Sequence, residues 1–121
     1  MRRFKVPVVT AADGTATAYS PRIAGKIHAI HYVKTDFADG VDFTITAEAT
    51  GESLWTESNV NASASRYPRA PTHTQAGAAA LYATGGTAVQ DRPAVASDRV
   101  KIVIAQGGNA KSGAFHIMVD D

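Results

Sequence analysis

The side chains best suited to chemistry in this chain are its four histidines, His28, His31, His73 and His116. His28 and His31 lie three positions apart in a segment with strand character. In a regular strand they point to opposite faces of the sheet, so they cannot share a metal ion unless a bulge intervenes. The chain has no cysteine, no His-Glu-x-x-His motif and no spaced cluster of carboxylates. The pattern predicts histidines hydrogen-bonded at a sheet face, with no metal and no cofactor.

Two other patterns could carry chemistry, a serine nucleophile and a glycine-rich phosphate loop. A Ser-His-Asp triad has no required spacing, but the chain lacks the Gly-x-Ser-x-Gly turn that exposes a nucleophilic serine. Residues 107–113, GGNAKSG, end in the Lys-Ser pair of a P-loop without its spacing. A strand pattern follows them, where a P-loop requires a helix. The sequence therefore predicts a hairpin loop at this point and a protein that is not an enzyme.

Residue types that dominate protein–protein contacts gather between positions 55 and 69. Trp55 precedes a polar stretch, and Arg66, Tyr67 and Arg69 end it. Trp, Tyr and Arg are enriched among the residues that carry interface energy. For Trp55, a core position and an interface position fit the sequence equally well. For Arg66 and Arg69, which flank Tyr67, we expect contact with the carboxylates of a partner.

A second candidate surface lies on the segment from Lys26 to Lys34, which is apolar in both of its alternating sets. Ile27, Ala29, His31 and Val33 form one set, and His28, Ile30 and Tyr32 form the other. A strand that is apolar on both faces is either central in a two-layer structure or covered by another subunit. We therefore include Ile30 and Tyr32 among the candidate partner-binding residues.

The elements that must position these residues are β-strands, because apolar residues recur with period two. Residues 41–48, VDFTITAE, are the clearest case. Further strands are predicted over 4–9, 15–19, 26–34, 52–56, 99–106 and 114–119, with turn residues between them. The alternation predicts the core residues Phe43, Ile45, Val100, Ile102, Ile104, Phe115 and Ile117.

The segment of about residues 59–97 differs from the rest, since it is rich in proline, glycine and alanine. We expect one or two helical turns over 76–82 and otherwise a long loop. Loops of this length are uncommon in compact domains and are often functional. The fold class expected for residues 1–121 is a single all-β domain, an antiparallel, jelly-roll-like β-sandwich with one long loop region.

The charge balance limits the possible partners. The formal net charge is +1, and charged residues make up 19% of the chain. A chain so nearly neutral has no global field that favours nucleic acid or an anionic membrane. The start, MRRFKVPVVT, has no long apolar stretch after its arginines, so we expect no signal peptide. Low charge also leaves room for surface that a protein partner covers.

Two parts of the sequence resemble small structural proteins of tailed bacteriophages and prophages. They are residues 24–70, AGKIHAIHYVKTDFADGVDFTITAEATGESLWTESNVNASASRYPRA, and residues 99–120, RVKIVIAQGGNAKSGAFHIMVD. Within that group the chain looks most like a head decoration, or cement, protein. The resemblance implies a β-sandwich or jelly-roll domain on the outer face of the capsid, made in the host bacterial cytoplasm. It also implies two partners, the major capsid protein and further copies of the chain in a homodimer or homotrimer.

Two other functions remain open. The first is another virion component, such as a neck, connector, tail or fibre-associated protein, and copy number would separate it from cement. The second is a carbohydrate-binding β-sandwich that uses Trp55 and Tyr67 as a stacking platform.

Overall fold

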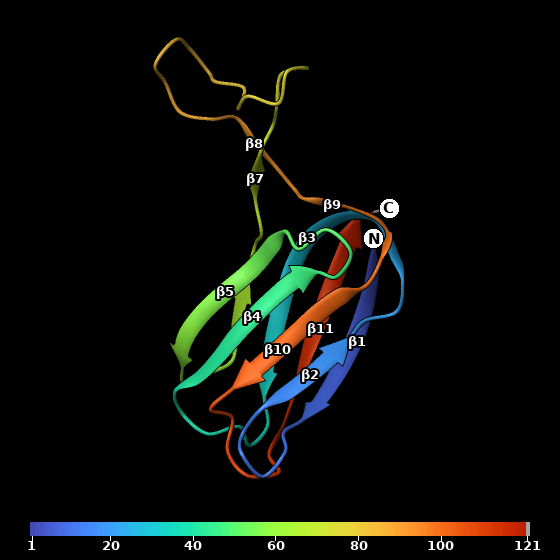
Figure 1. The fold of residues 1–121 in the computed structure, drawn as a ribbon, viewed down its shortest axis with the longest axis vertical. Helices are drawn as coiled ribbons and strands as arrows, with labels where there is room; N and C mark the ends of the chain where they lie inside the picture. Colours follow the sequence, from blue (N-terminus) through green and yellow to red (C-terminus); the bar gives the residue numbers. More distant parts are fainter. Residues whose placement is uncertain (121) are drawn as a thin grey trace.

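The computed structural model describes residues 1–120, which form two antiparallel sheets packed face to face and a thin arm that stands off one end (Figure 1). The first sheet has the order β1 (Arg2–Val9), β11 (Ser112–Asp120), β3 (Ile23–Lys34) and β6 (Ala64–Arg66), and β9 (Ala94–Asp98) also pairs with β3. The second has the order β2 (Ala16–Tyr19), β10 (Val100–Ala105), β4 (Val41–Ala47) and β5 (Ser53–Val60). At the base of the arm, β7 (Ala70–Pro71) pairs with β8 (Gln90–Asp91). The predicted all-β, sandwich-like class is confirmed.

The period-two pattern forms the core as predicted. In β4, buried Val41, Phe43, Ile45 and Ala47 alternate with more exposed polar residues. The facing sheet supplies Phe115 and Ile117 of β11. All seven predicted core residues are at most 1% exposed: Phe43, Ile45, Val100, Ile102, Ile104, Phe115 and Ile117.

The hypothesis that Ile30 and Tyr32 bind a partner is wrong, and of the two alternatives for Trp55 the core position holds, because all three side chains belong to this core. Ile30 and Tyr32 have 0% exposure and Trp55 has 5%. The Tyr32 ring lies edge-on to Phe43, with ring centroids 4.7 Å apart. Trp55 lies edge-on to the same Phe43 at 5.3 Å. Edge-to-face packing at these distances is favourable for aromatic pairs, so the cluster stabilises the sandwich and is closed to a partner.

A β-bulge in β3 explains why that strand seemed apolar on both faces. Ile27 pairs with Val119 and Ala29 pairs with Met118, so His28 is an extra residue without a cross-strand partner. The bulge shifts the alternation by one position. Ile27 therefore shares the inner face with Ile30 and Tyr32, which a regular strand would place opposite to it. His31 then falls on the outer face of the first sheet.

Removing the Tyr32 hydroxyl is expected to stabilise the fold. This oxygen is buried and has no hydrogen-bond partner among the described residues, and burial, followed by the charge of Asp39, raises the pKa of Tyr32 to about 12. A buried polar group without a partner costs free energy, so Tyr32→Phe should raise the free energy of unfolding by about 1 kcal/mol. Urea unfolding of both proteins measures the change. A decrease of similar size would show that the hydroxyl makes a stabilising hydrogen bond.

Candidate protein-interaction site

The arm is the part of the molecule that projects farthest from the sandwich (Figure 1). It is continuous with β7 and β8, which pair Ala70 with Asp91 and Pro71 with Gln90. Beyond these pairs, residues 72–89 form the head of the arm. Its centre is held by the amide of Ala80, which donates to the carbonyl of Thr72 at 2.8 Å, and by the amide of Val89, which donates to the carbonyl of Ala80 at 2.9 Å. Residues 78–82 therefore pair with both the outgoing and the returning leg of the arm.

The predicted helical turns over 76–82 are absent from the described structure, and this part of the sequence-based prediction is wrong. Ala79 bridges to His73 and Leu81 bridges to Ala88, both antiparallel. Gly77 and Gly85 take positive φ values of 88° and 72° and allow the turns on either side. A segment bonded to neighbours on both sides satisfies its backbone without a helix, so the helix preference of alanine does not decide its conformation here.

The head of the arm has no core and no formal charge. No residue from 70 to 91 is buried, and residues 72–89 contain no Asp, Glu, Lys or Arg. Leu81 is 46% exposed and Tyr82 is 75% exposed. An uncharged segment that exposes large apolar side chains is typical of the central part of a protein–protein contact, where charged residues are depleted.

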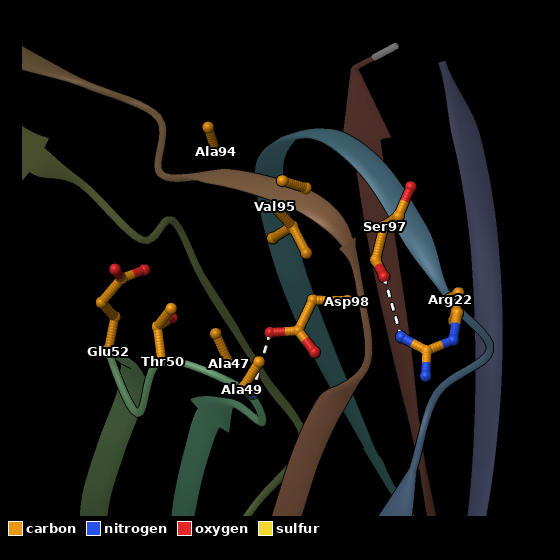
Figure 2. Close-up of a pocket in the computed structure, with 10 residues that line it drawn as sticks. Arg22, Ala47, Ala49, Thr50, Glu52, Ala94, Val95, Ser97 and Asp98 are labelled. Atoms are coloured by element: carbon orange, nitrogen blue, oxygen red, sulfur yellow. Dashed lines mark hydrogen bonds between the residues drawn. The ribbon is translucent and has the colours of Figure 1, made fainter.

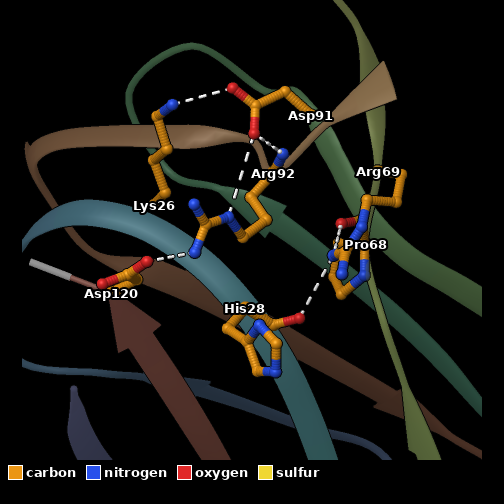
Figure 3. A network of polar contacts seen from close by, with 7 residues as sticks. All are labelled: Lys26, His28, Pro68, Arg69, Asp91, Arg92 and Asp120. Carbon is orange, nitrogen blue, oxygen red and sulfur yellow. Dashed lines mark hydrogen bonds and ion pairs between the residues drawn. The ribbon is translucent and has the colours of Figure 1, made fainter. Parts of the chain in front are cut away.

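A chain of ion pairs fixes the base of the arm to the first sheet (Figure 3). The Lys26 ammonium lies 2.7 Å from the Asp91 carboxylate of β8. Arg92 lies 3.8 Å from Asp91 and also pairs with Asp120 of β11. Hydrogen bonds from the Lys26 side chain and the Arg92 backbone lower the pKa of Asp91. These groups are half-exposed, so each pair adds little stability, but together they join the arm to two strands of the body.

Arg66, Tyr67 and Arg69, which were predicted to form one contact cluster, make different contacts in the structure. Arg66 donates two hydrogen bonds to Glu57, at 2.8 and 2.9 Å, and lies 5.6 Å from the centre of the Trp55 ring. These hydrogen bonds are the main reason that the pKa of Glu57 is lowered. Because β6 and β5 belong to different sheets, the pair links the two sheets at one edge. The carboxylate that Arg66 meets in the described structure belongs to its own chain, and the expected contact with a partner's carboxylate stays a prediction for this half-exposed residue.

Tyr67 and Arg69 lie beside β3, near the arm. Tyr67 is 60% exposed and packs edge-on to His28 with ring centroids 6.1 Å apart. The Arg69 guanidinium donates to the backbone carbonyls of His28 and Pro68, at 3.2 and 2.6 Å (Figure 3). Tyr67 is therefore accessible to a partner, whereas Arg69 holds the segment that leads into the arm.

Two hollows lie beside the turn between β4 and β5. One, of about 240 Å³, is lined by small residues of β9 and of that turn (Figure 2). Two of its charged groups serve the fold: Arg22 donates to the carbonyl of Ser97 at 2.9 Å, and Asp98 accepts from the amide of Ala49 at 3.0 Å. The other, of about 460 Å³, opens at the base of the arm beside Lys26, Asp91 and Arg92. The ion pairs of these three residues are those that fix the arm.

Within residues 1–120, no three His, Asp or Glu side chains come together in the way that a metal site requires. The described part of the chain contains no helix of the length and apolarity needed to cross a membrane.

Comparison with known proteins adds no relative. No protein-family model, no curated protein and no solved structure matches the chain.

Proposed function

We propose that this chain is a non-enzymatic structural protein of a bacteriophage particle, a decoration protein that binds the major capsid protein and connects neighbouring subunits of the shell. The head of the arm is the observation that supports this proposal most strongly. Its backbone is hydrogen-bonded, it exposes Leu81 and Tyr82, and it carries no charge over residues 72–89. The resemblance to phage structural proteins supplies the shell as the proposed location.

The energetics of docking favour the arm over other parts of the surface. Covering an uncharged segment removes no ion from water, which is the costly step in burying charged surface. The backbone hydrogen bonds of the arm already limit its conformations, so less entropy is lost on binding. A shell repeats the same site many times, and copies joined as a homodimer or homotrimer would gain avidity from that repetition.

The structure is compatible with one of the two other functions and weakens the other. A neck, connector or tail protein could use the same arm, and the copy number per particle separates these from a decoration protein. A carbohydrate-binding role loses its proposed platform, because Trp55 is buried and only Tyr67 of that pair is accessible. The proposal therefore includes neither nucleic acid nor membrane among the partners and locates the protein on the virion.

Replacing both exposed anchors of the arm is expected to weaken binding to the shell. The change is the double variant Leu81→Ser and Tyr82→Ser, which leaves the backbone hydrogen bonds of the arm in place. Loss of two central apolar contacts should reduce affinity for empty heads, prepared without this protein, by roughly tenfold or more. Co-sedimentation of purified protein with those heads measures the bound fraction.

Val9→Ser is the matched control, because Val9 is also an exposed apolar residue but lies on the body, at the end of β1. It should leave binding unchanged. Equal binding by the double variant and the unmodified protein would show that the arm is not the contact.

A further inference from the structure

The outer face of the first sheet carries a row of polar and basic residues in register across four strands. Lys5 of β1 pairs with His116 of β11, His116 pairs with His31 of β3, and His31 pairs with Ser65 of β6. The His31 imidazole is hydrogen-bonded to the Ser65 hydroxyl. The rings of His31 and His116 have centroids 6.4 Å apart. Neighbouring strands thus place four polar side chains next to one another, although they are far apart in sequence.

The charges on this face are unbalanced. Arg3 belongs to the adjacent row, where it pairs with Met118, and its charge acts on His116. Neither Arg3 nor Lys5 forms an ion pair with a residue that the structure describes. The carboxylate of Asp120, at the end of β11, is paired with Arg92. We call the set of Arg3, Lys5, His31, Ser65 and His116 the cationic face.

The environment of His116 reflects the excess of positive charge on the cationic face. Its Nδ1 atom is buried and has no hydrogen-bond partner among the described residues. Desolvation, followed by the charges of Arg3, Lys5 and His31, lowers the pKa of His116. These groups come from β1 and β3, the two strands that flank β11. Among the described residues no carboxylate forms an ion pair with Arg3 or Lys5, so carboxylates brought by another molecule would offset these charges.

We propose that the cationic face is a second docking surface and that it binds an acidic patch on a protein partner, more tightly as the pH falls. The inference goes beyond the proposed function, because the arm lacks charge and cannot itself select an acidic partner. A protein that connects subunits needs two contact surfaces, and this face lies on the body whereas the arm projects from it.

The number of charges and the kinds of residue on the cationic face favour a protein over a nucleic acid as the partner. Arg3 and Lys5 are the two permanent cations of the face, and nucleic-acid affinity depends on neutralising many phosphates. The partly exposed apolar residue Met118 shares the outer side of the sheet with the basic row. A mixture of charged and apolar side chains on one face is usual in protein–protein contacts.

The pH dependence follows from linkage. Carboxylates placed over the face favour the protonated form of His116, so they raise its pKa in the complex. The complex then binds more protons than the free protein, and its affinity must increase as the pH falls through the pKa of bound His116. Histidine ordinarily takes up its proton between about pH 8 and pH 5. We therefore expect the change between pH 7.5 and pH 5.5.

Binding of poly-L-aspartate to the full chain tests the inference. We expect the dissociation constant to be roughly fivefold or more lower at pH 5.5 than at pH 7.5, measured by fluorescence anisotropy at low salt. Lys5→Glu should weaken binding by a similar factor at both pH values. His116→Gln should retain binding at pH 7.5 and lose most of the pH dependence. Circular dichroism confirms that each variant is folded.

Three controls separate this inference from simpler explanations. Lys101→Glu changes the same charge on the second sheet and should leave binding unchanged; an effect equal to that of Lys5→Glu would overturn the inference. Absence of binding to poly-L-aspartate, or preferential binding of single-stranded oligothymidylate to the same residues, would also overturn it. The Leu81→Ser, Tyr82→Ser variant should bind poly-L-aspartate normally, so failure of the arm proposal and failure of this one are distinguishable.

Discussion

A chain in which residues 72–89 are replaced by Asn-Gly is expected to fold normally and to lose its binding to the shell. Asn-Gly suits a two-residue hairpin turn between Pro71 and Gln90, which are already cross-strand partners. The excised residues contribute no buried side chain, so the free energy of unfolding should change by less than about 1 kcal/mol. Affinity for empty heads should fall roughly hundredfold or more, because the whole proposed contact is gone. Urea unfolding and co-sedimentation with heads measure the two effects.

A second variant controls for the length of the arm. Replacing residues 72–89 with a Gly-Ser repeat of equal length keeps the bulk of the segment and removes its ordered backbone and its anchors. We expect this chain also to fold and to fail to bind. Full binding by either chain would place the contact elsewhere on the molecule.

Truncation of Ile102 is expected to have the largest effect on stability. Ile102 is fully buried in β10, a central strand of the second sheet, where it pairs with Ala18 and Ile45. Ile102→Ala removes three buried carbon atoms and leaves a cavity, which typically costs about 2–5 kcal/mol. Chemical denaturation of the variant measures the loss. Neighbouring Val103 points to the outer side of the same strand, so Val103→Ala should cost less than about 1 kcal/mol.

A similar small loss from both substitutions would contradict the assignment of the inner face. In that case Ile102 would lie on a surface from which its side chain can be removed without forming a cavity.

The strands and the core could be predicted from the sequence because both depend on local alternation. In β4, every second residue from Val41 to Ala47 is apolar, and those are the residues that are buried. The Gly-rich segment 107–113 likewise connects two predicted strands. Such an alternation can be recognised from the residues of a single strand.

The features that escaped prediction depend on contacts between distant segments. The bulge at His28 arises from the pairing of β3 with β11, and its effect was to make Ile30 and Tyr32 seem exposed. The partner of Arg66 proved to be Glu57 across the sandwich edge. The head of the arm takes its shape from hydrogen bonds between its two legs. Thr72 and Val89, for example, are bonded although they lie 17 residues apart in the sequence. No periodic pattern records such pairings.

The cationic face was hidden for the same reason. Lys5, His116 and His31 come from the two ends and the first third of the chain, and only the strand order brings them into one row. The net charge of the whole sequence, +1, combines the charges of this face with those of the rest of the surface and so does not reveal it. The three-residue spacing of His28 and His31 drew attention to these histidines. Which face of the sheet each one occupies depends on the bulge at His28.

Site-specific photo-crosslinking at position 82 of the assembled particle tests the central claim most directly. Tyr82 is replaced by p-benzoylphenylalanine, which keeps an aromatic side chain at the end of the arm, and Thr44 on the outer side of β4 is replaced in the same way as the control. The proposed function predicts that irradiation of intact virions joins position 82, and not position 44, to the major capsid protein. Crosslinks from position 82 that join only a neck or tail protein, or no protein at all, would contradict it.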